Sequence, residues 1–181
     1  MKRRTILQTS LAAGLTAGMV ALGLSEDEPP SLNKDMPPWR SIAWPFPRDA
    51  WLPGRAWRRG TLEVYVRPKL GFCGNCETGV TTDDEVDRVS DIDLLDERFE
   101  PAREGQAVRI GPLSGRARLY RFQVIGGGTR HAEGIAVSNK CDLVIAVIAG
   151  NLADERERTA AYRFLETSVV LDWIGQQLEG R

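Results

Sequence analysis

Alternation of apolar and polar side chains predicts a β-strand over residues 61–72. Leu62, Val64 and Val66 fall on one face of this stretch, and charged residues with one tyrosine fall on the other. Pro68 has no backbone N–H to donate, so we expect that end of the strand to lie at an edge or a bulge of a sheet.

Further strands are predicted over residues 108–110, 117–125, 132–137 and 142–148. The last of them reads DLVIAVIA, and such a continuous apolar run is typical of a central strand that is buried on both faces. Gly126-Gly127-Gly128 separates two strands and indicates a hairpin turn. It does not match a phosphate-binding loop, because the spacing is not G-x-G-x-x-G and no helical pattern follows it.

A short helix is predicted over about residues 83–90, because Thr82-Asp83-Asp84-Glu85 is a capping box whose acids lie where the helix dipole favours them. The acidic residues of this region are expected to cap the helix and to face solvent. Asp91 and Asp93 match a fragment of a calcium-binding loop, but the central glycine of that loop is missing.

The C-terminal stretch is predicted to be helical and to break near Thr167-Ser168, where a hydroxyl side chain can cap a second helix. An apolar stripe recurs at intervals of three and four residues and is expected to pack on the sheet. Its members are Tyr162, Leu165, Val169 and Trp173.

Grouped strands with segregated helices indicate the α+β class. We expect an antiparallel β-sheet packed against a C-terminal helix, in a single domain over residues 39–181. Residues 25–58 contain seven prolines and four tryptophans, which exclude a long helix and predict an extended Pro/Trp-rich N-terminal arm. Residues 25–38 are expected to be a flexible segment.

The first 24 residues, MKRRTILQTSLAAGLTAGMVALGL, place three cations before an apolar run rich in Ala and Gly, which is the pattern of a signal peptide. Arg3 and Arg4 followed by Thr5-Ile6-Leu7-Gln8 resemble the twin-arginine consensus. Residues 1–24 are therefore predicted to be a twin-arginine signal peptide for export to the bacterial periplasm; an ordinary secretory signal is the alternative. The run is shorter than the roughly 20 residues that span a membrane, so no stable span is expected after cleavage.

The arm carries four closely spaced tryptophans: Trp39, Trp44, Trp51 and Trp57. One interpretation is that the arm drapes over the domain and docks these indoles in the core. The other is that they form an aromatic surface for a ligand or a partner, since exposed aromatic residues mark interfaces.

Three cysteines leave several kinds of chemistry open. Cys73 and Cys76 form a Cys-x-x-Cys turn, and Cys141 immediately precedes the last predicted strand. An oxidising periplasm favours a structural disulfide, and any of the three pairings is possible. Alternatively, the three thiolates form a site for zinc or copper(I), which prefer soft ligands. Thioredoxin-like chemistry is disfavoured because Cys76 is not followed by a helix start.

His131 is the only histidine, and it is not expected to complete a metal site with Cys141. These two residues begin the two strands of one predicted hairpin, so they lie at opposite ends of its ladder. Catalysis also has no positive support. Ser114 lies in GPLSG rather than in the G-x-S-x-G of a nucleophile elbow, and a single histidine restricts acid–base chemistry.

The charge balance argues against nucleic acid as a partner. The 181 residues include 24 basic and 25 acidic side chains, for a net charge of −1, and removal of the cationic leader makes the remainder more acidic. Nucleic-acid binding requires a basic face, which this composition does not indicate.

The order of elements resembles the PsbP-like fold, in which an antiparallel sheet packs against helices that include a C-terminal one. The resemblance covers about residues 40–178 and rests on element order. The stretches WPFPRDAW, YVRPKLGFC and GRARLY are similar to a family of small, uncharacterised, Tat-exported proteobacterial proteins. That similarity implies export and a shared fold.

We therefore expect an exported periplasmic accessory or binding protein without catalytic activity and without a cofactor. It would act through a surface that binds an unidentified periplasmic protein or a small ligand. The alternative is a periplasmic thiol or metal-binding protein that uses Cys73, Cys76 and Cys141 with zinc or copper.

Overall fold

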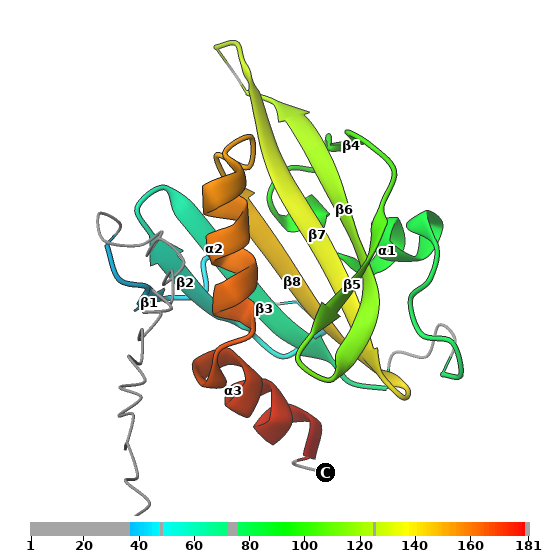
Figure 1. Cartoon of the computed structure of the whole chain (residues 1–181). Helices are drawn as coiled ribbons and strands as arrows, with labels where there is room; N and C mark the ends of the chain where they lie inside the picture. Colours follow the sequence, from blue (N-terminus) through cyan, green and yellow to red (C-terminus); the bar gives the residue numbers. More distant parts are fainter. Residues whose placement is uncertain (1–36, 48, 72–75, 125, 180–181) are drawn as a thin grey trace, which may run out of the picture. The chain divides into compact units, whose positions relative to one another are not determined.

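One antiparallel sheet of eight strands lies at the centre of the structure (Figure 1). Its order is β1-β2-β3-β8-β7-β6-β4, and β5 also pairs with β6. The strands are β1 (Arg40–Ile42), β2 (Arg55–Arg59), β3 (Leu62–Lys69), β4 (Glu100–Pro101), β5 (Gln106–Ile110), β6 (Leu113–Gln123), β7 (Thr129–Asn139) and β8 (Asp142–Gly150).

This computed structural model describes residues 37–47, 49–71, 76–124 and 126–179. All of them belong to one compact unit, Leu32–Arg181. The predicted signal peptide and the segment 25–36 lie outside the described residues, so both stay predictions. The predicted α+β class is confirmed, with an antiparallel sheet and a C-terminal helix.

The strand predicted to be central lies between β3 and β7, and its residues Leu143–Ala149 are all buried. β3 is the alternating strand predicted from the sequence. Its residue Pro68 pairs with Val144 of β8, whereas the pairing of β3 with β2 ends at Val66. The proline therefore lies where β3 has a neighbour on one side only, which tolerates the missing donor.

Two helices, α2 (Glu155–Leu165) and α3 (Ser168–Glu179), pack on one face of the sheet, which we call the helical face (Figure 1). They are separated at Thr167, as predicted, but its hydroxyl donates to the carbonyl oxygen of Phe164 at 2.7 Å and so closes the end of α2.

The break between the helices changes which side chains meet the sheet. Val169 was expected to pack on the sheet, but it is 56% exposed, so that prediction is wrong. The spacing of the predicted stripe holds only along one continuous helix. The turn at Thr167 rotates the second helix, so that Val170, Trp173 and Ile174 are buried instead.

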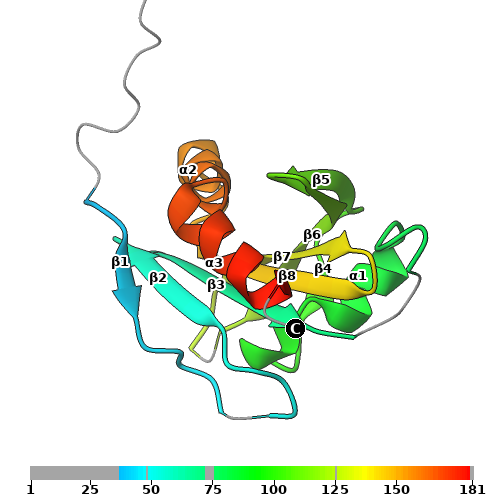
Figure 2. The same cartoon turned by 90° about the horizontal axis from the view of Figure 1, so that it is seen from below.

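The opposite face of the sheet, which we call the ionic face, is covered by shorter elements (Figure 2). These are α1 (Asp83–Val89), the 3-10 helix η1 (Ile92–Leu94) and the loop 43–54 between β1 and β2. The predicted capping box of α1 is confirmed, with Thr82 and Glu85 satisfying each other's backbone N–H groups.

Candidate functional site

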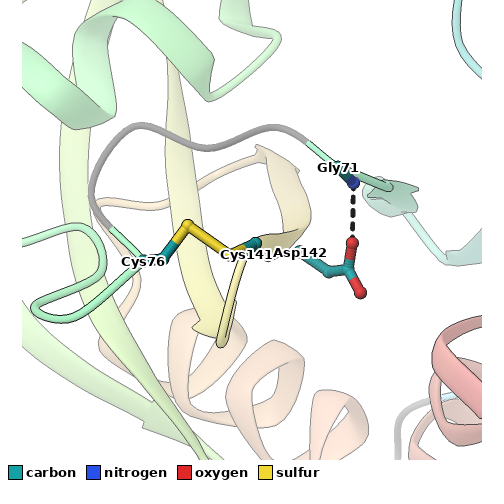
Figure 3. Close-up of a disulfide and its surroundings, with 4 residues drawn as sticks. All are labelled: Gly71, Cys76, Cys141 and Asp142. Atoms are coloured by element: carbon teal, nitrogen blue, oxygen red, sulfur yellow. Dashed lines mark hydrogen bonds between the residues drawn. A yellow bond between two sulfur atoms is a disulfide. The ribbon is translucent and has the colours of Figure 1, made fainter.

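A disulfide joins the loop after β3 to the turn between β7 and β8 (Figure 3). It links Cys76 to Cys141, residues 65 apart in the chain, with 4.5 Å between their Cα atoms. A structural disulfide was one of the interpretations, and this is one of its three possible pairings. Cys73 belongs to the same loop, but residues 72–75 lie outside the described residues. The bond staples the end of the β7–β8 hairpin to a distant segment of the chain.

Hydrogen bonds on both sides of the disulfide hold the loop against the same hairpin end. The backbone N–H of Gly71 donates to Asp142 at 2.7 Å (Figure 3), and that of Val80 donates to the Ser138 hydroxyl at 3.1 Å. Gly79 has a φ of 68°, and a Cβ there would lie 2.5 Å from the same hydroxyl oxygen. The loop can therefore approach the hairpin this closely only with glycine at this position.

The stapled turn forms one wall of a groove on the helical face. This α3 groove has a volume of about 380 Å³, and α3 and the β5–β6 turn form its other walls. Such a volume lies within the range of natural ligand pockets. The wall beside the disulfide consists of Ser138, Asn139 and Lys140. The disulfide thus crosslinks the turn that forms this wall to the loop after β3.

The helix wall of the α3 groove is apolar and contains a glycine. Leu171, Ile174 and Leu178 line it at intervals of three and four residues, so they lie along one face of α3. Gly175 lies among them, and a Cβ built there meets no atom within 4 Å. Glycine is about 1 kcal/mol less favourable than alanine inside a helix, and here its lack of a side chain leaves the groove open.

Among the described residues that line the α3 groove, acidic side chains outnumber basic ones. Asp172 and Glu179 of α3 face the groove, and Lys140 is the cation on the opposite wall. Pro112 and Leu113 extend the apolar surface from the β5–β6 turn. The groove therefore combines an apolar floor with a negatively charged helix.

The four tryptophans of the arm do not gather at one place. Trp57 is 4% exposed, and its ring lies 5.4 Å from that of Phe164 in the core of the helical face, so it offers no surface to a partner. Trp39 also belongs to the helical face, where it stacks on Phe164 at 4.3 Å.

The other two tryptophans lie on the ionic face. Trp44 is half-buried, and its ring makes an edge contact with Tyr65 at 6.2 Å. Trp51 is half-buried beside Lys69, whose Nζ lies 5.7 Å from the ring centroid. Packing of the indoles on the domain thus explains much of the tryptophan pattern of the arm. The side chains of Trp39, Trp44 and Trp51 remain only partly accessible to solvent.

No metal site is visible in the part of the chain that the structure describes, where no three His, Cys, Asp or Glu side chains gather closely enough to hold an ion. The proposed site of three thiolates includes Cys73 and so is not covered by that statement. His131 pairs with Gly150 and Asn139 pairs with Asp142, so His131 and Cys141 lie at opposite ends of the hairpin, as expected.

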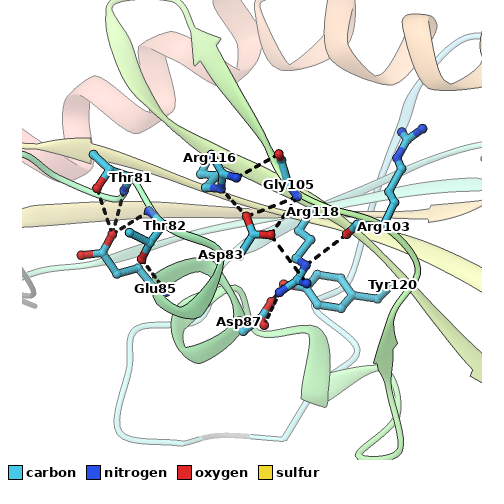
Figure 4. A network of polar contacts seen from close by, with 10 residues as sticks. All are labelled: Thr81, Thr82, Asp83, Glu85, Asp87, Arg103, Gly105, Arg116, Arg118 and Tyr120. Carbon is cyan, nitrogen blue, oxygen red and sulfur yellow. Dashed lines mark hydrogen bonds and ion pairs between the residues drawn. The ribbon is translucent and has the colours of Figure 1, made fainter.

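Acidic side chains of α1 bind arginines of β6 (Figure 4). Arg116 donates to Asp83, Arg118 donates to Asp87, and the Tyr120 hydroxyl donates to Asp87 at 2.6 Å. The prediction that the acids of this region face solvent is therefore wrong for both aspartates, and also for Asp91, which is buried and pairs with Arg67 and Lys69 of β3. The pairing of α1 with β6 joins residues more than 30 positions apart, so the local sequence pattern did not reveal it.

The electrostatics of Asp83 follow from these contacts. The backbone N–H of Gly105 donates to its carboxylate at 3.0 Å and is the main cause of a lowered pKa, which the charges of Arg118 and Arg116 lower further. Ionised Asp83 is therefore part of what holds α1 on the sheet.

The chain matches no family model, no curated protein and no solved structure. The resemblance to the PsbP-like fold accordingly stays a prediction. Among the described residues, no helix combines the length and the apolar character needed to cross a membrane.

Proposed function

We propose that the protein is an exported accessory protein that binds a periplasmic partner through the α3 groove and has no catalytic activity of its own. The observation that carries this proposal is a groove with a disulfide-stapled wall, in which apolar side chains of α3 lie beside two carboxylates. Disulfides persist in oxidising compartments, which supports export by the predicted twin-arginine signal.

The chemistry of the groove favours a peptide segment that carries both apolar and basic side chains. Leu171, Ile174 and Leu178 supply apolar surface, and Gly175 leaves room for a side chain to approach the helix backbone. Asp172 and Glu179 attract a lysine or arginine, and Lys140 disfavours a second cation on the opposite wall. The partner segment is therefore apolar with a cation on its helix-facing side.

Selection of peptides from a displayed library on the oxidised mature domain tests this proposal. We expect the enriched peptides to be apolar with lysine or arginine, and to bind a Gly175→Trp variant at least tenfold more weakly. The new indole projects into the groove of about 380 Å³, and its Cβ meets no atom within 4 Å. Val169→Trp is the matched control, since Val169 is exposed on the same helix.

Two results would contradict the proposal. One is enrichment of acidic peptides, because the helix wall would repel them. The other is equal binding by the two tryptophan variants, because only one of them alters the groove. A melting curve for each variant establishes that both are folded.

A second function rests on the accessibility of the cysteines. Cys76 is exposed and disulfide-bonded to Cys141, and Cys73 precedes it by three positions in the chain. We propose as the alternative that these three residues exchange disulfides or bind zinc or copper. Intact mass under native and then denaturing conditions tests metal binding: metal lost on denaturation, with three reduced thiols, supports it, and one disulfide without added mass contradicts it. Trapping of a mixed disulfide with a thiol substrate tests exchange, and no trapped product would contradict it.

A further inference from the structure

We infer that a second groove, on the ionic face, binds a small organic anion that has an apolar body. This site, the Arg130 groove, has a volume of about 360 Å³ and lies where β3 and β7 begin and β6 and β8 end. The segment after η1 forms its outer wall. Its ligand, location and chemistry differ from those of the α3 groove, so this inference stands without the proposed function.

The two carboxylates that line the Arg130 groove are already engaged. One oxygen of Glu63 accepts from Arg58 Nε at 2.7 Å, and its other oxygen accepts from the Tyr65 hydroxyl. Asp96 accepts from the backbone N–H of Arg98 at 2.9 Å and from its guanidinium at 3.2 Å. Each carboxylate is therefore already paired with an arginine close to it in the sequence.

Arg130 is the cation that remains. Among the residues that the structure describes, it forms no ion pair, and it lines the groove beside half-buried His131. Burial and the Glu63 carboxylate raise the pKa of Tyr65, and the charges of Arg58 and Arg130 oppose that rise. Arg130 therefore supplies the positive charge of the groove with which an anion would pair.

The floor of the Arg130 groove suits an apolar ligand body. Phe122 and Ala149 belong to the buried cluster of the ionic face, and Leu95 packs against that cluster. Val124, the residue after the end of β6, is 39% exposed and adds accessible apolar surface. A ligand that covers these side chains while its anionic group contacts Arg130 satisfies both halves of the site. The guanidinium can hold a carboxylate through two parallel N–H donors.

Nuclear magnetic resonance titration of the mature domain with 4-phenylbutyrate tests this inference, with 4-phenylbutan-1-ol as the uncharged probe of the same shape. We expect saturable shifts at the amides of Phe122 and Ala149 with the acid, and at least tenfold weaker binding of the alcohol. Arg130→Gln should weaken binding of the acid by about tenfold. Arg109→Gln, an exposed arginine of β5, should leave it unchanged.

The inference is overturned if the alcohol binds as tightly as the acid, because the anion would then contribute nothing. Equal weakening by Arg130→Gln and Arg109→Gln would also overturn it, since net charge alone would then explain the effect. Shifts confined to α3 would place the probe in the other groove and contradict the assignment. Comparison of the uncomplexed spectra establishes that both variants keep the fold.

Discussion

On one face of the sheet, two helices pack mainly through apolar and aromatic side chains, with one buried ion pair between Arg158 of α2 and Glu133 of β7. On the other face, shorter elements combine smaller apolar clusters with several ion pairs. Trp57, Phe164 and Trp173 meet in the core of the helical face. On the ionic face, the buried cations Arg67 and Lys69 of β3 both pair with Asp91, at the start of η1. Arg67 also binds Asp49 of the loop 43–54 at 2.7 Å.

The difference follows from what each covering element can bury. α2 and α3 have 11 and 12 residues and present whole apolar faces to the sheet. α1 has seven residues and buries two valines, so apolar contact alone holds it weakly. Charged side chains of β3 and β6 supply the remaining attachment. Acid and the removal of single charges should therefore loosen the ionic face before the helical face.

Loss of Asp91 should have the largest effect on stability. Asp91→Asn leaves the buried cations Arg67 and Lys69 without their shared carboxylate, which typically costs about 3–5 kcal/mol. Urea unfolding measures the change. Asp93→Asn, two positions further on at an exposed site, should change the free energy of unfolding by less than about 0.5 kcal/mol. Equal losses in the two variants would show that Asp91 does not anchor the ionic face.

Removal of the disulfide should have the next largest effect. Cys76→Ser combined with Cys141→Ser releases a crosslink between residues 65 apart, and should lower the free energy of unfolding by about 2–4 kcal/mol. Because the bond crosslinks the turn that forms a wall of the α3 groove, peptides selected on the oxidised protein should also bind more weakly. Unchanged peptide binding by the double variant would show that the α3 groove does not depend on the disulfide.

Acid should release α1 before it releases α2 and α3. The folded pKa of Asp83 lies below its unfolded value, so its contribution to stability is present above about pH 4 and is lost as the pH falls through the folded pKa. Hydrogen bonds from the backbone N–H groups of Thr81 and Thr82 also lower the pKa of the Glu85 carboxyl. Its contribution to stability is therefore likewise lost as the pH falls. Amide hydrogen exchange between pH 6 and 3 measures protection of each helix.

The control for this pH dependence is Asp83→Asn. Its α1 should exchange faster at pH 6 and should depend less on pH than α1 of the parent protein. If α2 and α3 lost protection at the same pH as α1 in the parent, the two faces would share one mode of attachment and the comparison would fail.

Replacement of Gly175 by alanine should have the smallest effect and the opposite sign. The position is helical and a Cβ meets no atom within 4 Å, so Gly175→Ala should raise the free energy of unfolding by about 0.5–1 kcal/mol. Thermal melting measures it. A lower melting temperature would mean that the space above Gly175 is not open, and would undermine the α3 groove.

Local patterns predicted those parts of the fold that depend on neighbouring residues. The alternation of β3, the continuous apolar run of β8 and the capping box of α1 were all readable from short stretches. β2 was missed because Arg55, Arg58 and Arg59 obscure its pattern. Arg55 and Arg59 lie over the rings of Trp173 and Trp39, contacts that only the folded chain creates.

The candidate sites were less predictable because both are assembled from distant segments. Cys76 and Cys141 were identified, but three pairings were open, and the chosen one depends on the packing of a loop against a hairpin. The Arg130 groove gave no signal, since nothing in the local sequence distinguishes Arg130 from the other arginines of the chain. The four closely spaced tryptophans suggested a binding surface, but two of them, Trp39 and Trp57, pack on Phe164 of the helical face.

Photo-crosslinking in the exporting cell tests the central claim, that the α3 groove is the binding surface, most directly. The amino acid p-benzoylphenylalanine is placed at Gly175 in the groove or at Val169 on the solvent side of the same helix. We predict a discrete crosslinked periplasmic protein from position 175 and none from position 169. The same product from both positions, or from position 169 alone, would contradict the claim.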